Sequence, residues 1–321
     1  MQNVNKNKTL IVVTGPTGSG KTDLAIKLAL HYGCHILSAD SRQLYREIPI
    51  GTAAPTAEQL ALVPHHFVGT LSLEDYYSAA QYEEDVMRLL PRLWQDNDYV
   101  VMCGGSMMYV DAVTKGIDEL PTITSEIREK AMSIYREGGV ELLRSTLLEI
   151  APVYYNQVDL NNHKRLVHAI EITMQAGVPY SSLRTGRAKE RPFRIVKMAL
   201  DYEREELFNR INRRVDAMVE AGLEQEARSV FHLRHLNSLN TVGYKEMFAY
   251  FDGVMDYDTA VARIGKNTRV YAKKQLTWNK RDESLKLLSP QSAFEQAVAL
   301  IGNAQRSIKA KRKESRLIWQ M

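Results

Sequence analysis

The stretch that decides the fold runs Gly15-Pro16-Thr17-Gly18-Ser19-Gly20-Lys21-Thr22. It matches G-x-x-x-x-G-K-[ST], the phosphate-binding P-loop. The apolar run at residues 10–13 predicts a buried strand before it, and residues 22–30 predict a helix after it, stopped by Gly33. A strand, a glycine-rich turn and a helix are the context that this motif requires. The sequence therefore predicts an α/β fold built on a P-loop core.

The residue types in this stretch suit a di- or triphosphate ligand. Glycines allow backbone amides to approach phosphate oxygens, and the N-terminus of the helix adds free amides and a positive dipole end. Lys21 adds a full charge, and the Thr22 hydroxyl is placed to bind a magnesium ion that shares the phosphate. We therefore predict all eight residues as phosphate ligands and Mg²⁺ as the cofactor, in preference to a glycine-rich turn without a ligand.

The composition is that of an ordinary globular protein. The chain has 321 residues and a formal net charge of +4. It has no apolar run long enough to span a membrane and no secretory signal at its start, and its two cysteines lack metal-binding spacing. We expect a cytoplasmic protein. Basic residues gather at 184–194, 263–281 and 306–316, which suggests a polyanionic partner.

Four further apolar runs, at 35–40, 99–103, 194–201 and 285–288, predict strands of a parallel sheet flanked by helices. Between the third and fourth of the five predicted strands the chain reads as helices only, which predicts a helical insertion domain that acts as a lid. The expected divisions are a disordered tail at 1–8, a first core part at 9–119, the insertion at 120–192, a second core part at 193–301 with a basic helix at 258–281, and a basic tail at 302–321.

The ends of two predicted strands point to the chemistry. Asp40 follows the second strand, and ligands of open α/β sheets lie at the carboxyl ends of strands, so Asp40 is expected in the same crevice as the P-loop. The third strand ends in Cys103-Gly104-Gly105-Ser106, where a nucleotide hydrolase carries a magnesium-binding aspartate. Simple ATP hydrolysis is therefore disfavoured, although the sequence leaves open whether a nucleotide also occupies the P-loop.

Taken together, six motifs resemble the tRNA dimethylallyltransferases, also called tRNA isopentenyltransferases. They are the P-loop, Asp40-Ser41-Arg42-Gln43, the Gly104–Tyr109 turn (GGSMMY), 162–171 (NHKRLVHAIE), 242–246 (VGYKE) and 268–278 (TRVYAKKQLTW). The resemblance extends from about Thr9 to Asp282 and depends on the order and spacing of all six, since the P-loop alone is widespread.

The resemblance implies transfer of a dimethylallyl group from dimethylallyl diphosphate to N6 of the adenosine 3′-adjacent to the anticodon of a tRNA. Such an amine is a poor nucleophile, and a carboxylate can orient it and accept its proton, a role we assign to Asp40. Ser106 replaces the family's usual threonine as a hydrogen-bonding hydroxyl, and Arg269 is the expected second cation on the diphosphate. The residues expected to bind tRNA are Asp40, Ser41, Arg42, Gln43, Ser106, Arg128, Lys164, Arg165, Leu166, Val167 and His168.

One substitution and two alternatives qualify this interpretation. His168 stands where the family usually has arginine, and a neutral imidazole cannot form a bidentate pair with phosphate. A P-loop kinase of a small metabolite, with Asp40 as base, is the first alternative, and a non-catalytic RNA-binding protein is the second. The basic segments disfavour the kinase, and the combination of Asp40, Lys21 and Arg269 disfavours the binding protein. We expect a monomer.

Overall fold

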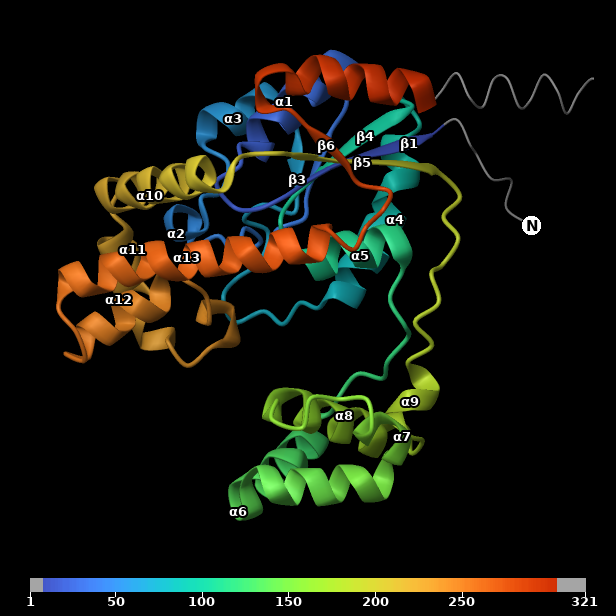
Figure 1. Ribbon diagram of the computed structural model, residues 1–321, viewed down its shortest axis with the longest axis vertical. Helices are drawn as coiled ribbons and strands as arrows, with labels where there is room; N and C mark the ends of the chain where they lie inside the picture. The colour runs from blue at the N-terminus through green and yellow to red at the C-terminus, as the bar shows by residue number, and fades with distance from the viewer. Residues whose placement is uncertain (1–7, 305–321) are drawn as a thin grey trace, which may run out of the picture. The chain divides into compact units, whose positions relative to one another are not determined.

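The computed structural model describes residues 8–304, and its core is a six-stranded, wholly parallel sheet (Figure 1). The strand order is β3-β2-β4-β1-β5-β6. The strands are β1 (Thr9–Thr14), β2 (Ile36–Ser38), β3 (His65–His66), β4 (Tyr99–Cys103), β5 (Arg194–Leu200) and β6 (Lys286–Leu288). The expected parallel sheet is therefore confirmed, and β1, which leads into the P-loop, lies between β4 and β5.

Alternation along β1 explains how helices cover both faces of the sheet. Ile11 and Val13 pack with α1 (Lys21–Tyr32) and the helical residues 293–304 on one face. Leu10 and Val12 pack on the other face, with α4 (Ala79–Leu93) and α5 (Met107–Lys115). Figure 1 shows this layering. Because every residue of β1 is buried, the strand is apolar on both faces, as parallel strands in such layers are.

A second group of helices follows β5 in the chain. These are α10 (Arg204–Glu220), α11 (Leu223–Ser229), α12 (Tyr244–Phe251) and α13 (Tyr257–Asn279), with 3₁₀ turns at Phe231–Leu233 and Asn237–Leu239. Helices α10 and α13 pack through Leu207, Ile211 and Ala272. Asp256 caps α13 by accepting a hydrogen bond from the Thr259 amide.

Residues Lys115–Lys189 form a separate compact unit that contains only helices. They are α6 (Ser125–Ile150), α7 (Pro152–Tyr155), α8 (His163–Ala176) and α9 (Tyr180–Leu183). Non-helical backbone at Gly139, whose φ is 60°, divides α6 into two helical segments. Leu147 and Ile170 join the core of this unit.

The structure differs from the expected divisions at the helical unit and at both tails. The helical unit begins and ends a few residues earlier than 120–192. Within the first core part, the segment 49–70 contains α2 (Pro49–Thr52), α3 (Ala57–Leu62) and the edge strand β3. Lys8, expected in a disordered tail, forms a 2.9 Å ion pair with Asp98. The rest of that tail and most of the basic tail at 302–321 lie outside the described residues, although 302–304 are helical.

No helix among residues 8–304 has the length and apolar character needed to cross a lipid bilayer.

Arg191, which lies just before β5, contacts α4 and α5. Its Nη2 lies 2.6 Å from Glu83 Oε1 and also donates to the carbonyl of Ala112, while Nε donates to the carbonyl of Val113. Both charged side chains are less than a tenth exposed. A buried charge whose partner is removed destabilises a protein strongly.

We therefore expect Arg191→Ala to lower the free energy of unfolding by about 3–5 kcal/mol, because it leaves Glu83 buried without this guanidinium. Urea unfolding followed by circular dichroism measures the loss. Arg187→Ala removes the same side chain from an exposed position and is the control. Equal stability of the two variants would contradict the assigned role of Arg191.

Candidate functional site

The P-loop has the expected backbone, and α10 packs against it. Gly18 and Gly20 have φ values of 80° and 82°, which favour glycine. A Cβ on Gly18 would lie 2.9 Å from Cγ1 of Ile211, so a side chain there would collide with α10. Arg210 Nε donates to the Gly18 carbonyl at 2.9 Å. The phosphate-binding loop is therefore shaped by a helix almost two hundred residues away in sequence.

The second glycine turn, after β4, holds the loop that carries Asp40. A Cβ on Gly104 would lie 2.2 Å from the carbonyl oxygen of Ala39, so only glycine allows this approach. Ser106 donates its amide to the same carbonyl, and its Oγ accepts the Ser41 amide at 2.8 Å. Oδ1 of Asp40 accepts the Arg42 amide at 3.0 Å. Asp40 is thus fixed at the carboxyl edge of the sheet, as predicted.

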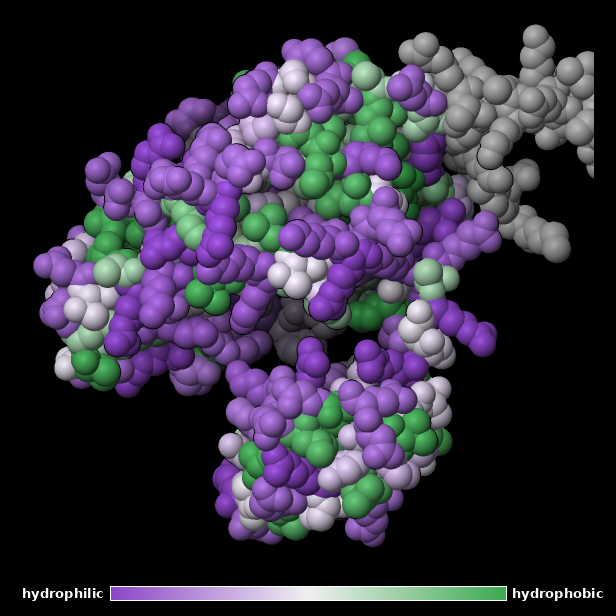
Figure 2. Space-filling model, viewed as in Figure 1, coloured by the Kyte–Doolittle hydropathy of each residue, from purple (hydrophilic) through white to green (hydrophobic). Residues whose placement is uncertain are grey.

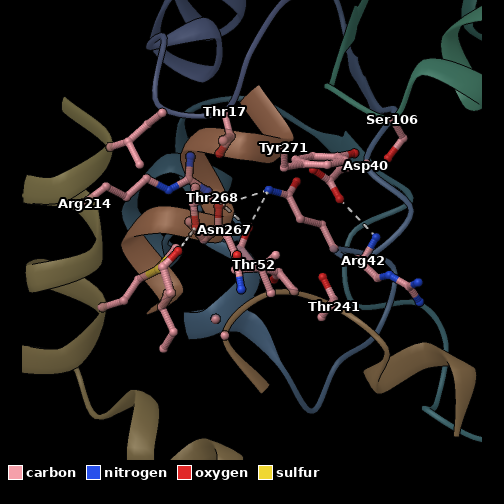
Figure 3. A pocket seen from close by; sticks show the side chains of 18 of the residues that line it. Thr17, Asp40, Arg42, Thr52, Ser106, Arg214, Thr241, Asn267, Thr268 and Tyr271 are labelled. Atoms are coloured by element: carbon pink, nitrogen blue, oxygen red, sulfur yellow. Dashed lines mark hydrogen bonds between the residues drawn. The ribbon is translucent and has the colours of Figure 1, made fainter. Parts of the chain in front are cut away.

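A cavity of about 530 Å³ joins these two turns. Thr17, Lys21 and Thr22 line it from the P-loop side, and Asp40 and Ser106 line it from the other turn. Figure 3 shows Tyr271 beside Asp40 and Arg214 pointing into the same space. The cavity also has apolar wall residues, contributed by α10 and α13: Ile211, Val215, Met218 and Ile264.

Two of the cations that line this cavity, Lys21 and Arg214, are half-buried. Burial and the neighbouring Arg214 charge lower the pKa of Lys21, against the opposing influence of Cys103 and Asp40. Burial also lowers the pKa of Arg214, and Asp40 opposes that shift. Within residues 8–304, neither cation has a carboxylate within 4.0 Å. Cations held out of water without an ion pair favour an anionic ligand.

Neutral groups complete the surroundings of Asp40. Burial, and then the Asp40 charge, raise the pKa of the Tyr271 hydroxyl to about 12. Burial raises the pKa of the Cys103 thiol to about 11, although Lys21 and a hydrogen bond from Thr22 lower it. Both groups are therefore uncharged near neutral pH. Two acidic side chains line the cavity, Asp40 and Glu246, and Glu246 already accepts hydrogen bonds from the Gly243 amide and from Asn267.

Arg214 and Tyr271 escaped the sequence analysis, although a signal for Arg214 was present. Arg214 follows Leu207 and Ile211 by seven and three residues, so it falls on the apolar stripe of α10, where a charge is unusual. Tyr271 belongs to one of the quoted motifs, but nothing in its spacing pointed to Asp40.

Arg269 is not where we expected it. It is absent from the residues that line the cavity, and its guanidinium donates to Asn212 of α10. The face of α13 that lines the cavity carries Thr268 and Tyr271, whereas Arg269 projects toward α10. The prediction that Arg269 is the second cation beside the P-loop is therefore wrong in this structure, and Arg214 occupies that place.

The other residues predicted beside Asp40 differ in whether their side chains are already hydrogen-bonded within the protein. Ser41 and Arg42 line the cavity, and the Arg42 guanidinium donates to the carbonyls of Asn237 and Ser238. Gln43 donates its amide to the carbonyls of Thr52 and Ala53 and accepts from Ser38. Gln43 therefore supports the cavity wall, and a contact between it and RNA stays a prediction.

The residues predicted to bind tRNA in the helical unit separate into exposed and buried ones. Arg128, Lys164, Arg165 and His168 are exposed. Glu171 lies 3.8 Å from Arg128 Nε and 3.9 Å from His168 Nδ1, so these two side chains share one neighbour.

Leu166 and Val167, by contrast, are buried in the core of this unit. They fall on the apolar side of α8, because residues three and four apart share a face of a helix. The prediction that they bind tRNA is wrong for these two side chains.

The cavity fits magnesium only as an ion that accompanies the ligand. Among residues 8–304, no group of three or more His, Cys, Asp or Glu side chains could hold a metal. Mg²⁺ typically keeps several waters and binds one or two protein groups plus substrate phosphates. The Thr22 hydroxyl, which lines the cavity beside Lys21, suits this arrangement.

Comparisons with known proteins point to one family. Residues 43–282 match the family model described as IPP transferase. The chain is 54% identical over 287 residues to tRNA dimethylallyltransferase 1 of Phocaeicola vulgatus, covering 89% of this chain and 96% of that one. It is 53% identical over 302 residues to tRNA dimethylallyltransferase 1 of Bacteroides fragilis, covering 94% and 99%.

Solved structures show the same architecture. The crystal structure of the full-length tRNA isopentenylpyrophosphate transferase from Bacillus halodurans is similar with a TM-score of 0.69 and 30% identity, covering 96% of this chain and all of that one (100%). A eukaryotic dimethylallyltransferase acting on tRNA is similar with a TM-score of 0.77, covering 94% and 80%, and at 22% identity this likeness concerns the fold alone.

Arg214→Ala is expected to weaken the binding of inorganic diphosphate about ten- to a hundredfold, because a hydrogen bond to a charged group contributes about 1.5–3 kcal/mol. Isothermal titration calorimetry with excess magnesium measures the dissociation constant. Arg213→Ala, on the exposed side of the same helix, controls for the loss of net charge. If both variants bind equally well, Arg214 does not contact the ligand.

The lowered pKa of Lys21 predicts a pH dependence. An anionic ligand favours protonated Lys21, so diphosphate affinity should fall as the pH rises through this pKa, earlier than for an ordinary lysine. The folding stability of the free protein has the opposite pH dependence. Because the unfolded chain binds the Lys21 proton more tightly than the folded protein does, the free energy of unfolding rises with pH between the lowered pKa and the ordinary lysine pKa. Lys21→Arg keeps its charge and provides the baseline for titration of the ligand itself. Parallel pH profiles for the two proteins would refute the prediction.

Proposed function

The chain belongs to the IPP transferase family, and from this premise we propose that it transfers a dimethylallyl group from dimethylallyl diphosphate to N6 of the adenosine 3′-adjacent to the anticodon in tRNA. The observation that carries the proposal is a single cavity with Lys21 and Arg214 at one side and Asp40 at another. This arrangement offers an anion site for a leaving group and a carboxylate for an attacking amine.

The donor side would bind the diphosphate of the prenyl substrate. Amides of the P-loop, Lys21 and Arg214 face the cavity and would neutralise the negative charge that grows on the leaving diphosphate. A bound Mg²⁺, held by the Thr22 hydroxyl with phosphate oxygens and water, would supply further positive charge. The apolar wall formed by Val215, Ile264 and their neighbours suits a hydrocarbon group.

The acceptor side would position the adenine amine. The Arg42 amide binds Oδ1 of Asp40, which orients the carboxylate and leaves Oδ2 for the substrate. In the reaction a bond forms between N6 and the carbon of the prenyl group that carries the diphosphate. The bond from that carbon to oxygen breaks, its electron pair leaves with the diphosphate, and the N6 proton passes to Asp40.

Positive charge on the surface supports an RNA substrate. Lys266, Lys273 and Lys274 are exposed along α13, and Lys280 is exposed just after it, in a region that is largely hydrophilic in Figure 2. In the helical unit, Arg128, Lys164 and Arg165 are exposed as well. Such cations bind the phosphate backbone, and a base can then be turned out of its stack into a pocket.

The partners and the location follow from the same proposal. We propose that the enzyme is a monomer. A tRNA substrate supports a cytoplasmic location. A kinase acting on a small metabolite has no specific observation in its favour, since β4 ends in Cys103 and two glycines where a nucleotide hydrolase carries an aspartate.

The direct test is to incubate the protein with unmodified tRNA, dimethylallyl diphosphate and magnesium, and to weigh the digested nucleosides. We expect adenosine heavier by one dimethylallyl group. Asp40→Asn should lower turnover about 10²–10⁴-fold, the usual contribution of a general base. Asp216→Asn, an exposed carboxylate on α10, is the matched control. In a parallel incubation with ATP in place of dimethylallyl diphosphate, formation of ADP without a modified nucleoside would instead support the kinase.

A further inference from the structure

A single turn of helix, α2, forms part of the cavity wall. Gly51 and Thr52 of this turn and Ala53, which follows it, line the cavity. A helix of four residues is not stable by itself, because helix nucleation is unfavourable. Ala53 has a left-handed φ of 44°, a conformation that is unfavourable for residues other than glycine. Contacts with the rest of the core must therefore hold this turn in place.

The carboxylate of Glu226, on α11, holds the N-terminal end of the turn. Oε2 accepts the amide of Ile50 at 2.7 Å, and Oε1 accepts the amide of Gly51 at 2.8 Å. Pro49, the first residue of the turn, has no amide hydrogen, so Glu226 satisfies the first two amides that α2 offers. Negative charge is also electrostatically favourable at this end of a helix.

Tyr244 of α12 holds the Glu226 carboxylate against the turn. Its hydroxyl donates to Oε1 of Glu226, and the hydroxyl oxygen lies 3.3 Å from the carbonyl oxygen of Ile48. The Tyr244 side chain is fully buried. A Cβ on Gly51 would lie 2.4 Å from the same hydroxyl oxygen, so the tyrosine packs directly on the turn. The carboxylate therefore has little freedom to leave α2.

The other end of the turn meets Arg214. Nη2 of Arg214 donates to the carbonyl of Thr52 at 3.4 Å. Gln43 donates to the same carbonyl at 3.3 Å and to the carbonyl of Ala53 at 3.0 Å. A positive group at the carbonyl end of a helical turn complements a negative group at its amide end. Helix α2 thus connects the carboxylate of Glu226 to the guanidinium in the cavity.

We propose that Glu226 is a positioning residue for the diphosphate site and that it acts on Arg214 through α2. The carboxylate fixes the turn, the turn fixes the Thr52 carbonyl, and that carbonyl orients the guanidinium in the cavity. Glu226 is not among the residues that line the cavity, so it acts without touching the ligand. The inference rests on the proposed function, since it takes Arg214 to bind the leaving diphosphate.

The test measures the binding of inorganic diphosphate to the full chain by isothermal titration calorimetry with excess magnesium. Glu226→Gln keeps the size of the side chain but has a single oxygen, so it cannot accept both amides in the same way. We expect the dissociation constant to rise about three- to tenfold. Loss of the negative charge alone would favour an anion and lower the dissociation constant, so a rise identifies an effect on geometry.

A double-mutant cycle with Arg214→Ala separates positioning from general damage to the site. Without the Arg214 guanidinium, Glu226→Gln should change the dissociation constant less than about twofold, because the group that it positions is missing. Glu220→Gln, at an exposed position at the end of α10, controls for the lost charge. Circular dichroism establishes that each variant is folded. Glu226→Asp keeps the charge on a shorter side chain and should give a smaller rise, and it takes the place of Glu226→Gln in the cycle if that variant does not fold.

Equal weakening by Glu226→Gln in the presence and in the absence of Arg214 would overturn the proposal. So would a dissociation constant that Glu226→Gln leaves unchanged or lowers. The assay contains neither tRNA nor a prenyl group, so a protein that shows the coupling but does not prenylate tRNA would contradict the proposed function alone.

Discussion

The placement of two half-buried cations, Lys21 and Arg214, in one cavity is the constraint on which the site depends. Each has a pKa lowered by burial, and the Asp40 charge opposes both shifts without closing an ion pair. Placing like charges together away from water is unfavourable unless a ligand of opposite charge completes the arrangement. The cavity therefore carries positive charge that a bound diphosphate would neutralise, and Asp40 is the negative charge that opposes the pKa shifts of both cations.

The scaffold keeps these groups apart yet within one cavity by using parts of the chain that are remote in sequence. The carboxyl ends of β1, β2 and β4 bring the P-loop, Asp40 and the Gly104 turn to one edge of the sheet, as parallel topology requires. Helix α10 then packs against the P-loop through Ile211 and brings Arg214 into the cavity. Close packing of backbone against backbone at Gly104 leaves little freedom for this edge to relax.

In the helical unit, buried apolar residues and exposed cations lie on opposite sides of the same helices. Its core is made by Leu147, Leu166 and Ile170, while its cations lie on the solvent side of the same helices. A motif that mixes both kinds of residue, such as 164–168 (KRLVH), therefore serves two purposes at once. Its charged members are available to an RNA backbone, and its apolar members hold α8 against α6.

Local sequence was enough for whatever depends on neighbours along the chain. The P-loop, the capping of α13 by Asp256, the five longer strands and the position of Asp40 all follow from short-range patterns of glycine, apolar and capping residues. The two-residue strand β3 was missed because it is too short to show a period. What only the tertiary structure decided is which face of a helix meets the site. Arg269 lies on α13 and Arg214 on α10, and the packing of these two helices turns Arg269 toward its neighbour and Arg214 into the cavity. Composition cannot make that choice, because the direction of a long side chain depends on contacts between residues that the sequence separates by more than fifty positions.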